Sequence, residues 1–393
     1  MANTPNIRFK GFADDWEQRK IEEICTYHSS SLTIKDIDED GVYNLYDANS
    51  LIGKTNKGSM IEDYITIIKD GAGVGRTRLL PKNTMFLGTM GALTPKNSNL
   101  DFLFQLITKA NLGKAYTGST IPHIYFKDYG KNKYYIPCYD EQCILGVYFS
   151  NLDLLITLHQ RKCDEVKQLK KFMLQKMLPK NGELIPEIRF AGFTDDWEQH
   201  KLGEFSDIKT GPFGSTLHAD DYINDGMPII TTEHFKSGQL PTVKDGIPQV
   251  SENDYCRLSS YILNTNDIVF SRVGSVDINA LVTPYQDKWL FSGRVLRVRP
   301  YAEIDSMFLH TLLETDSVRN DIISRAVGQT MPSINTEILK ITSLCLPQDI
   351  DEQREIGEYF CIFDRLINLH QHKCDQLKEV KRFMLQNMFP QKG

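Results

Sequence analysis

Glycine-rich segments beside basic residues are the first candidates for a chemical site in this 393-residue sequence. Residues 53–55 (Gly-Lys-Thr) end like a phosphate-binding P-loop, but that motif needs a further glycine at the position of Ala48. Without it the backbone cannot form the tight anion-binding nest. Residues 71–75 (Gly-Ala-Gly-Val-Gly) follow an apolar run, yet a dinucleotide-binding fingerprint needs glycine where Arg76 stands. We therefore interpret both segments as flexible basic loops and not as nucleotide sites.

Arginine, lysine and hydroxyl side chains on such loops suit contact with DNA. Arg76 and Arg78 stand beside three glycines, so their loop can approach a DNA backbone or base edge closely. Residues 209–216 form a Gly/Pro-punctuated loop with hydroxyls and an aromatic, and residues 271–275 follow an apolar run much as residues 69–76 do. Ordinary structural turns are the alternative interpretation of each segment. The candidate DNA-binding residues are Lys54, Lys57, Lys69, Arg76, Arg78, Lys209, Thr210, Phe213, Ser215, Lys236, Arg272 and Ser275.

Catalytic motifs are absent from the sequence. It has no N-P-P-[FY] or D-P-P-[FY] of base-amino methyltransferases, no Walker A, no G-x-S-x-G and no H-E-x-x-H. His159 and His370 could suggest a metal, but they occupy corresponding positions on repeated apolar stripes, so we expect core histidines with hydrogen-bond partners. The adjacent carboxylates 14–15 and 195–196 each precede a tryptophan, and we interpret these segments as a duplicated packing motif.

The elements that must position these loops are two copies of one long helix. Residues 151–179 recur as residues 362–390, an offset of 211 without a gap. Neither copy contains glycine or an internal proline, and apolar residues recur at helical spacing. About 28 residues at ~1.5 Å per residue give a rod of roughly 42 Å. Two matching apolar stripes predict an intramolecular two-helix coiled coil. The alternative is that each helix packs on the core of its own domain.

A second repeat precedes the helices. Residues 7–18 return as residues 188–199, an offset of 181. The blocks between leader and helix share no long identity, but both end in a similar exit, residues 118–124 (Gly-Ser-Thr-Ile-Pro-His-Ile) and 328–334 (Gly-Gln-Thr-Met-Pro-Ser-Ile). Short β-like runs mixed with helical pieces predict an α+β fold with two similar domains and two long helices. We predict boundaries of 1–145 and 181–355 for the domains, and 146–180 and 356–393 for the helices.

Composition bounds the function further. No run of 18 apolar residues occurs, and the start of the sequence has no signal-peptide pattern, which predicts a cytoplasmic protein. The eight cysteines include no C-x-x-C pair, so we expect reduced thiols and neither a zinc site nor a disulfide framework. A net charge of −6 argues mildly against a protein that binds nucleic acid by itself.

The duplicated frame resembles the specificity subunit of type I restriction–modification systems, and the match covers essentially the whole chain. Each motif alone is weak, but their order and duplication are specific. The resemblance rests on the leader Arg8-Phe-x-Gly-Phe-x-x-x-Trp16 and its copy at Arg189–Trp197, on Lys209-Thr-Gly-Pro-Phe-Gly-Ser215, on the Thr-x-Pro-x-Ile exits, on Glu141-Gln142 and Glu352-Gln353, and on the two long helices.

The resemblance implies a non-catalytic subunit that serves phage defence. Each variable block would read one half of a bipartite, asymmetric DNA target, and the helices, packed antiparallel, would set the spacer. Two modification subunits would carry S-adenosylmethionine, and restriction subunits would use ATP and Mg. Methionine is adaptable at interfaces, so the expected partner-subunit interface comprises Phe172, Met173, Met177, Phe383, Met384 and Met388. The alternatives are a scaffold or repeat protein without a DNA role, and an enzyme with a cryptic nuclease site in a variable block.

Overall fold

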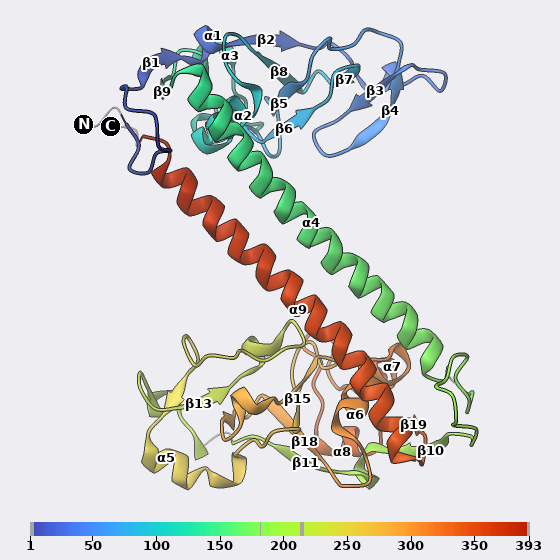
Figure 1. Ribbon diagram of the computed structural model, residues 1–393. Helices are drawn as coiled ribbons and strands as arrows, with labels where there is room; N and C mark the ends of the chain where they lie inside the picture. Colours follow the sequence, from blue (N-terminus) through green and yellow to red (C-terminus); the bar gives the residue numbers. More distant parts are fainter. Residues whose placement is uncertain (1–3, 119, 181, 213–215, 391–393) are drawn as a thin grey trace. The chain divides into compact units, whose positions relative to one another are not determined.

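The computed structural model describes residues 4–118, 120–180, 182–212 and 216–390. The chain divides into two compact units (Figure 1). Unit 1 comprises Met1–Arg161 with His370–Gly393, and unit 2 comprises Lys162–Leu369. The division cuts both long helices, so each unit contains one end of each helix.

Unit 1 is built on short antiparallel strands around a buried central strand. The apolar run Tyr-Ile-Thr-Ile-Ile forms β5 (Tyr64–Ile68), and all five of its residues are buried. It lies in a four-stranded sheet with the order β2 (Cys25–Ser29), β8 (Met90–Pro95), β5, β6 (Thr77–Leu80). The other sheets are β4 (Leu51–Thr55), β3 (Tyr43–Tyr46), β7 (Thr84–Phe86), and β1 (Glu17–Lys20) with β9 (Lys133–Ile136). The short helices are α1 (Ile21–Ile24), α2 (Leu100–Ala110) and α3 (Phe126–Tyr129).

Unit 2 repeats this plan with more strands. Its main antiparallel sheet has the order β11 (Ser206–Thr210), β18 (Val295–Pro300), β15 (Ile268–Ser271), β16 (Asn279–Leu281). A second sheet has the order β12 (Tyr222–Ile223), β14 (Gln249–Val250), β13 (Met227–Ile230), β17 (Leu290–Phe291), and β10 (Glu198–Lys201) pairs with β19 (Ser343–Leu346). The short helices are α5 (Glu252–Arg257), α6 (Ser306–Leu313), α7 (Asp316–Arg325) and α8 (Thr336–Lys340). The prediction of a mixed α and β fold is confirmed.

The long helices are α4 (Tyr139–Met177) and α9 (Ile350–Asn387). They begin seven and six residues before the predicted helical segments, which start at residues 146 and 356. Gly146 and Gly357 lie inside the helices, where a close approach requires glycine. A Cβ on Gly146 would lie 2.5 Å from Asn99 Oδ1, and one on Gly357 would lie 2.6 Å from the Phe308 nitrogen. The glycines therefore allow α4 to pack closely against the start of α2, and α9 against the start of α6.

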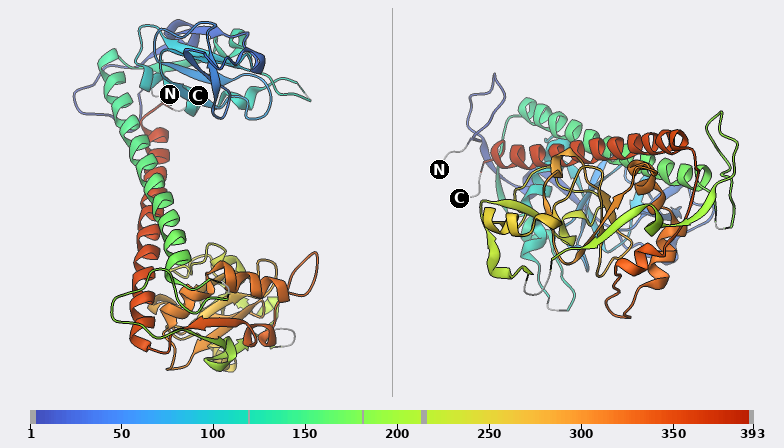
Figure 2. Two further views of the ribbon diagram at one scale, coloured as in Figure 1. Left: turned by 90° about the vertical axis from the view of Figure 1, so that its right-hand side faces the viewer. Right: turned by 90° about the horizontal axis from the view of Figure 1, so that it is seen from below.

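The two long helices pack against each other in opposite directions in each unit, as the fold prediction required (Figure 2). In unit 1 the Lys381 ammonium lies 2.6 Å from Asp153 Oδ1, and in unit 2 the Lys170 ammonium lies 2.7 Å from Asp364 Oδ1. These two ion pairs are related by the repeat offset of 211. His159 Nδ1 lies 3.1 Å from His370 Nδ1, so each of the expected core histidines is the hydrogen-bond partner of the other.

The end of each long helix completes a core formed by the other half of the sequence. Neither the predicted coiled coil nor the alternative, packing of each helix on its own domain, includes this contact. In unit 1, Phe389 is buried among Trp16, Phe102 and Phe149. In unit 2, Met177 and Leu178 lie in the cluster that contains Trp197 and Phe308. The leader tryptophans are therefore core residues, as predicted.

The repeated Glu-Gln pair explains how the leader is attached in unit 1. The Arg8 guanidinium donates to both carboxylate oxygens of buried Glu141, at 2.8 and 2.7 Å. Gln142 accepts from the Asn99 nitrogen at 3.0 Å and donates to the Pro137 carbonyl at 2.9 Å. Glu141 therefore binds the leader, and Gln142 binds the start of α2.

Unit 2 reproduces this attachment. Arg189 binds Glu352 at 2.6 and 2.7 Å, and Gln353 accepts from the Asp305 nitrogen at 2.9 Å. Asn99 and Asp305 are the N-cap residues of α2 and α6. A bidentate arginine–carboxylate pair with little solvent exposure is a strong, directional contact. The duplicated motifs are thus the frame that positions the loops. Within the described residues, no helix is long and apolar enough to cross a membrane.

Candidate nucleic-acid interface

A glycine-containing turn between β5 and β6 is tied to a proline hairpin in unit 1. The hairpin exchanges two N–H···O bonds of 2.8 Å between residues 117 and 123. The Gly71 N–H donates to the Pro122 carbonyl, and the Ile124 N–H donates to the Lys69 carbonyl, both at 2.9 Å. We call residues 69–76 with 117–118 and 120–124 the first composite loop.

Unit 2 contains the corresponding arrangement after β15. The hairpin bonds join residues 327 and 333, both at 2.9 Å. The Gly274 N–H donates to the Pro332 carbonyl at 2.8 Å, and the Ile334 N–H donates to the Arg272 carbonyl at 2.9 Å. We call residues 272–276 with 327–334 the second composite loop. The sequence indicated separately that the two turns resemble each other and that the two exits resemble each other. In the structure each turn is hydrogen-bonded to its exit hairpin, so both resemblances belong to one repeated arrangement.

The composite loops lie in stretches of sequence with few carboxylates, and Asp70 is the single acid among their residues. Residues 71–82 and 112–127 contain five Lys or Arg and no Asp or Glu, although the whole chain has 51 acidic and 45 basic residues. Residues 268–276 and 322–336 contain Arg272 and Arg325 and again no acid. Asp70 is part of the first loop, and its Oδ1 lies 2.7 Å from His123 Nδ1. A locally basic surface on an acidic protein is the pattern expected for a polyanion site.

The two predicted arginines of unit 1 join the first composite loop to the turn that follows β3. Arg76 donates to the Ala48 carbonyl and to Asn49 Oδ1, both at 2.6 Å. Arg78 donates to the Asn49 carbonyl at 3.2 Å, and its guanidinium lies 5.1 Å from the centre of the Tyr46 ring. Arg76 is exposed and Arg78 half-buried. Both guanidiniums are therefore held in place before any ligand arrives, which reduces the entropy lost on binding.

The predicted residues of unit 2 gather at one end of its main sheet. Thr210 pairs with Leu296 and Ser271 with Val295, so the ends of β11 and β15 flank the start of β18. Lys209, next to Thr210, donates to the Ser260 carbonyl at 3.0 Å and lies 4.6 Å from the centre of the Tyr261 ring. The structure thus brings Thr210 to the same edge as the second composite loop.

Three other candidate residues belong to the composite loops. Lys69, in the first loop, lies 3.7 Å from Asp70. In the second loop Arg272 donates to the Gly293 carbonyl at 3.2 Å, while Ser275 is exposed. The remaining described candidates lie outside the loops: Lys54 is exposed on β4, Lys57 pairs with Asp36 at 2.6 Å, and Lys236 pairs with Glu233. Phe213 and Ser215 lie outside the described residues.

Sequence reasoning missed five residues in or beside these loops. Lys114 and Lys127 are exposed beside the first hairpin, and Arg325, which pairs with Asp321 at 2.8 Å, is exposed beside the second. Ile121 and Met331 are exposed at the hairpin tips. The Thr-x-Pro-x-Ile match could have indicated these last two, since the first variable residue of that match is apolar in both copies.

Comparison with known proteins identifies the family. The model of the family described as "Type I restriction modification DNA specificity domain" matches residues 13–168 and again residues 194–379. The chain belongs to this family. It is 24% identical over 394 residues to the type I restriction enzyme MjaVIII specificity subunit of Methanocaldococcus jannaschii, covering 94% of this chain and 91% of that protein. It is 27% identical over 203 residues to a putative MjaX specificity subunit of the same organism, covering 50% of this chain and 46% of that one.

A solved structure shows the same fold as this specificity-family chain. It is the crystal structure of a type I restriction–modification system S subunit from M. genitalium, with a TM-score of 0.69 and 17% sequence identity. The match covers 99% of this chain and 100% of that chain. Both family matches include a composite loop, a Glu-Gln pair and most of a long helix, so the internal repeat is a repeat of the specificity domain.

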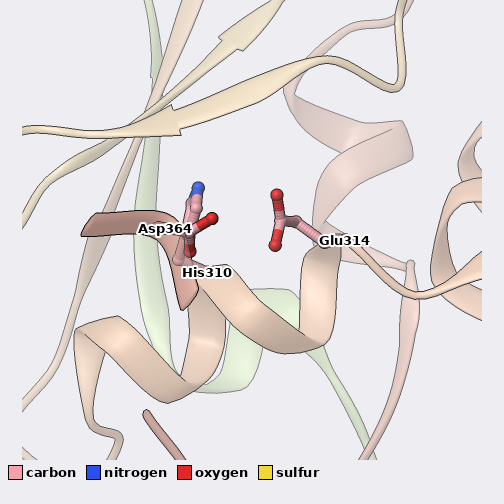
Figure 3. A group of neighbouring side chains, drawn as sticks. All are labelled: His310, Glu314 and Asp364. Atoms are coloured by element: carbon pink, nitrogen blue, oxygen red, sulfur yellow. The ribbon is translucent and has the colours of Figure 1, made fainter. Parts of the chain in front are cut away.

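One cluster in unit 2 has the residue types of a metal site. His310 on α6, Glu314 just after it and Asp364 on α9 offer ligand atoms within 4.8 Å of one another (Figure 3). The Lys170 ammonium already lies 2.5 Å from Glu314 and 2.7 Å from Asp364. Burial lowers the pKa of Lys170, but the two carboxylates raise it above its ordinary value. A cation is thus supplied by the chain itself, and we interpret the cluster as a joint between α6, α4 and α9.

The residues expected at a partner-subunit interface fall into two groups. Met177 and Met388 are buried in the cores, and Met173 and Met384 are partly buried against them, so these methionines already have partners within the chain. Phe172 and Phe383 are exposed at corresponding positions of the two helices. Leu158 and Leu369 form a second exposed pair related by the same offset.

Proposed function

We propose that this chain is the DNA-reading subunit of a type I restriction–modification complex and that each unit reads one half of a bipartite target. The observation that supports this most is the pair of composite loops. They have corresponding main-chain bonds, contain a single carboxylate between them and belong to domains whose other loops differ. Main-chain donors, hydroxyls and arginines on such loops are suited to phosphates and base edges.

An asymmetric target follows from the differences between the two loops. The first carries two arginines that are bonded to the turn after β3, whereas the second carries Arg272 and a neighbouring exposed serine. Different donor sets at corresponding positions select different bases. We infer that the long helices set the length of the unread spacer. A helix of 39 residues is roughly 58 Å long, which exceeds one turn of duplex DNA at ~34–36 Å.

Two modification subunits are the partners that the helices fit. Phe172 and Phe383, and Leu158 and Leu369, expose apolar surface at positions related by the repeat. Apolar surface that occurs twice on one chain suits two copies of one partner. In this proposal S-adenosylmethionine binds the modification subunits, ATP and Mg bind the restriction subunits, and the present chain contributes recognition without catalysis.

The test is the methylation pattern of a host that carries the intact system. The expected result is one bipartite motif with two unlike halves separated by a fixed gap. A continuous or palindromic motif would contradict the proposal. Gel shifts of the purified chain, alone and with its modification subunits, address the scaffold alternative, because a scaffold gives no sequence-specific shift in either case.

A further inference from the structure

The tips of the two proline hairpins expose a large apolar side chain at the same position. Ile121 is 52% exposed and Met331 is 66% exposed. A single exposed apolar residue on a protein surface is ordinary. Two such residues, at corresponding tips of domains that otherwise share no long identity, require a shared reason.

Both tips are held rigidly. Gly118 and Gly328 have φ values of +103° or slightly less, a region that favours glycine. A Cβ on Gly118 would lie 2.3 Å from the carbonyl oxygen of Ile121, and one on Gly328 would lie 2.8 Å from that of Met331. The main-chain bonds from Pro122 and Pro332 to the neighbouring turns fix the other side of each tip. The backbone that carries the two apolar side chains is thus constrained on both sides, and the side chains remain exposed.

The surroundings of the tips favour DNA over a protein as the contacted surface. No acid occurs in residues 112–127 or 322–336, the exposed cations Lys114 and Lys127 accompany the first tip, and Arg325, paired with Asp321 at 2.8 Å, accompanies the second. Each tip is bonded to the turn that carries Lys69 or Arg272. An apolar residue among cations on a rigid tip is the arrangement by which proteins insert a wedge between base pairs, while neighbouring cations hold the phosphates.

We propose that Ile121 and Met331 are apolar wedges, one for each half-site, that insert between stacked base pairs of the bound DNA. This inference rests on the proposed reading of a bipartite target. The partner common to both tips is the duplex itself, which is why both tips are apolar although the bases read beside them differ. Insertion opens one base step in each half-site and bends the duplex there.

The experiment uses the full chain assembled with its modification subunits and fluorescent duplexes carrying the motif found by methylation mapping. A set of duplexes has one abasic position moved through each half-site, which removes stacking at that step. The variants are Ile121→Ser and Met331→Ser. Ile61→Ser is the matched control, because Ile61 is 87% exposed in unit 1 and lies outside the composite loops. Melting temperatures of all variants confirm folding.

The expected result has two parts. Ile121→Ser weakens binding to intact DNA about tenfold, which corresponds to losing most of the burial of one isoleucine. Wild type binds one abasic duplex per half-site more tightly than the intact duplex, because the stack there is already open. Ile121→Ser loses this gain in one half-site, Met331→Ser loses it in the other, and Ile61→Ser retains both.

Three results would overturn the wedge. These are wild-type affinity of Ile121→Ser for intact DNA, equal losses on every abasic duplex, or reduced capture of modification subunits by Ile121→Ser without DNA while the abasic gains persist. The last outcome would assign the tips to a protein contact. If the wild-type complex itself prefers no sequence, the proposed function fails, which is a different result from a preference that the tip variants leave intact.

Discussion

Phe389 and Phe383 lie near the end of the same helix, and substitutions at these two residues test stability and subunit assembly separately. Phe389 is 2% exposed, with its ring 5.6 Å from Phe102, 5.8 Å from Phe149 and 6.1 Å from Trp16, measured between centroids. Phe383 is 56% exposed. We predict that Phe389→Ala destabilises unit 1 strongly and that Phe383→Ala leaves its stability unchanged.

The magnitude follows from burial. A phenylalanine side chain buries roughly 150–250 Å², which at about 25 cal/mol per Å² amounts to about 4–6 kcal/mol, part of which alanine retains. Measured Phe→Ala changes in cores cost about 3–5 kcal/mol. Phe383→Ala removes no core contact and should stay within about 0.5 kcal/mol. For a unit of this size, the first change lowers the melting temperature by roughly 10 °C.

Denaturant unfolding measures the size of the loss, and hydrogen exchange locates it. For Phe389→Ala, protection should fall in unit 1 around Trp16 and α2 and persist in the core around Trp197. Phe383→Ala should instead reduce capture of modification subunits. Equal destabilisation by the two variants, or a loss of protection spread evenly over both units, would refute the argument that the end of α9 completes the core of unit 1.

Three further predictions concern the loops and the helix pair. Arg76→Ala should weaken binding to one half-site and Arg272→Ala to the other, by about 1–3 kcal/mol, and binding assays on duplexes with one half-site scrambled distinguish them. Lys170→Met leaves Glu314 and Asp364 without their cation in a largely buried site and should cost about 3–5 kcal/mol, whereas Lys381→Met, at a more exposed pair, should cost about 1 kcal/mol or less in unfolding titrations. Burial lowers the pKa of His310, so the unfolded chain binds a proton that the folded chain excludes. The contribution of this group to stability is therefore present above about pH 6.5 and decreases on acidification by up to about 1.4 kcal/mol per pH unit. His310→Gln should make the melting temperature depend less on pH between about pH 5.5 and 7.5.

The repeat made the frame predictable but not the reason for each repeated residue. Trp16 and Trp197 were predicted to be packing residues because adjacent carboxylates suit no active site, and both are buried. The role of Glu141-Gln142 could not be read from sequence, because its partners, Arg8 and the N-cap Asn99, are distant in the chain. Such contacts depend on which elements meet, which periodicity does not determine.

The helix ends show a different limit. An apolar stripe identifies the buried face of a helix but not the molecule that buries it, so Met177 and Met388 suited a partner subunit as well as a core. The structure resolves this, since the end of α4 lies in unit 2 in the cluster with Trp197 and the end of α9 lies in unit 1 in the cluster with Trp16. The predicted helical segments start at residues 146 and 356, after α4 and α9 begin, and so leave out the Glu-Gln pairs that lie in the first turns of the helices. Glycine normally disfavours a helix interior, whereas Gly146 and Gly357 lie inside these helices because a close approach to the start of α2 or α6 requires them.

Duplication itself separates the roles of the residues. A feature that recurs in both halves must serve something that is also present twice, such as a domain core, a copy of a partner subunit or the duplex structure at each half-site. A feature that differs can select between the two half-sites. By this criterion, and under the proposed function, we assign the Arg–Glu pairs to the frame, the helix faces to the partner and the hairpin tips to the duplex, and we expect Arg76, Arg78, Arg272 and Ser275 to distinguish bases. Exchanging residues 69–76 for the corresponding turn of unit 2 should therefore change the bases of one half-site and leave the spacer length unchanged. A changed spacer would show that the turns take part in setting the separation.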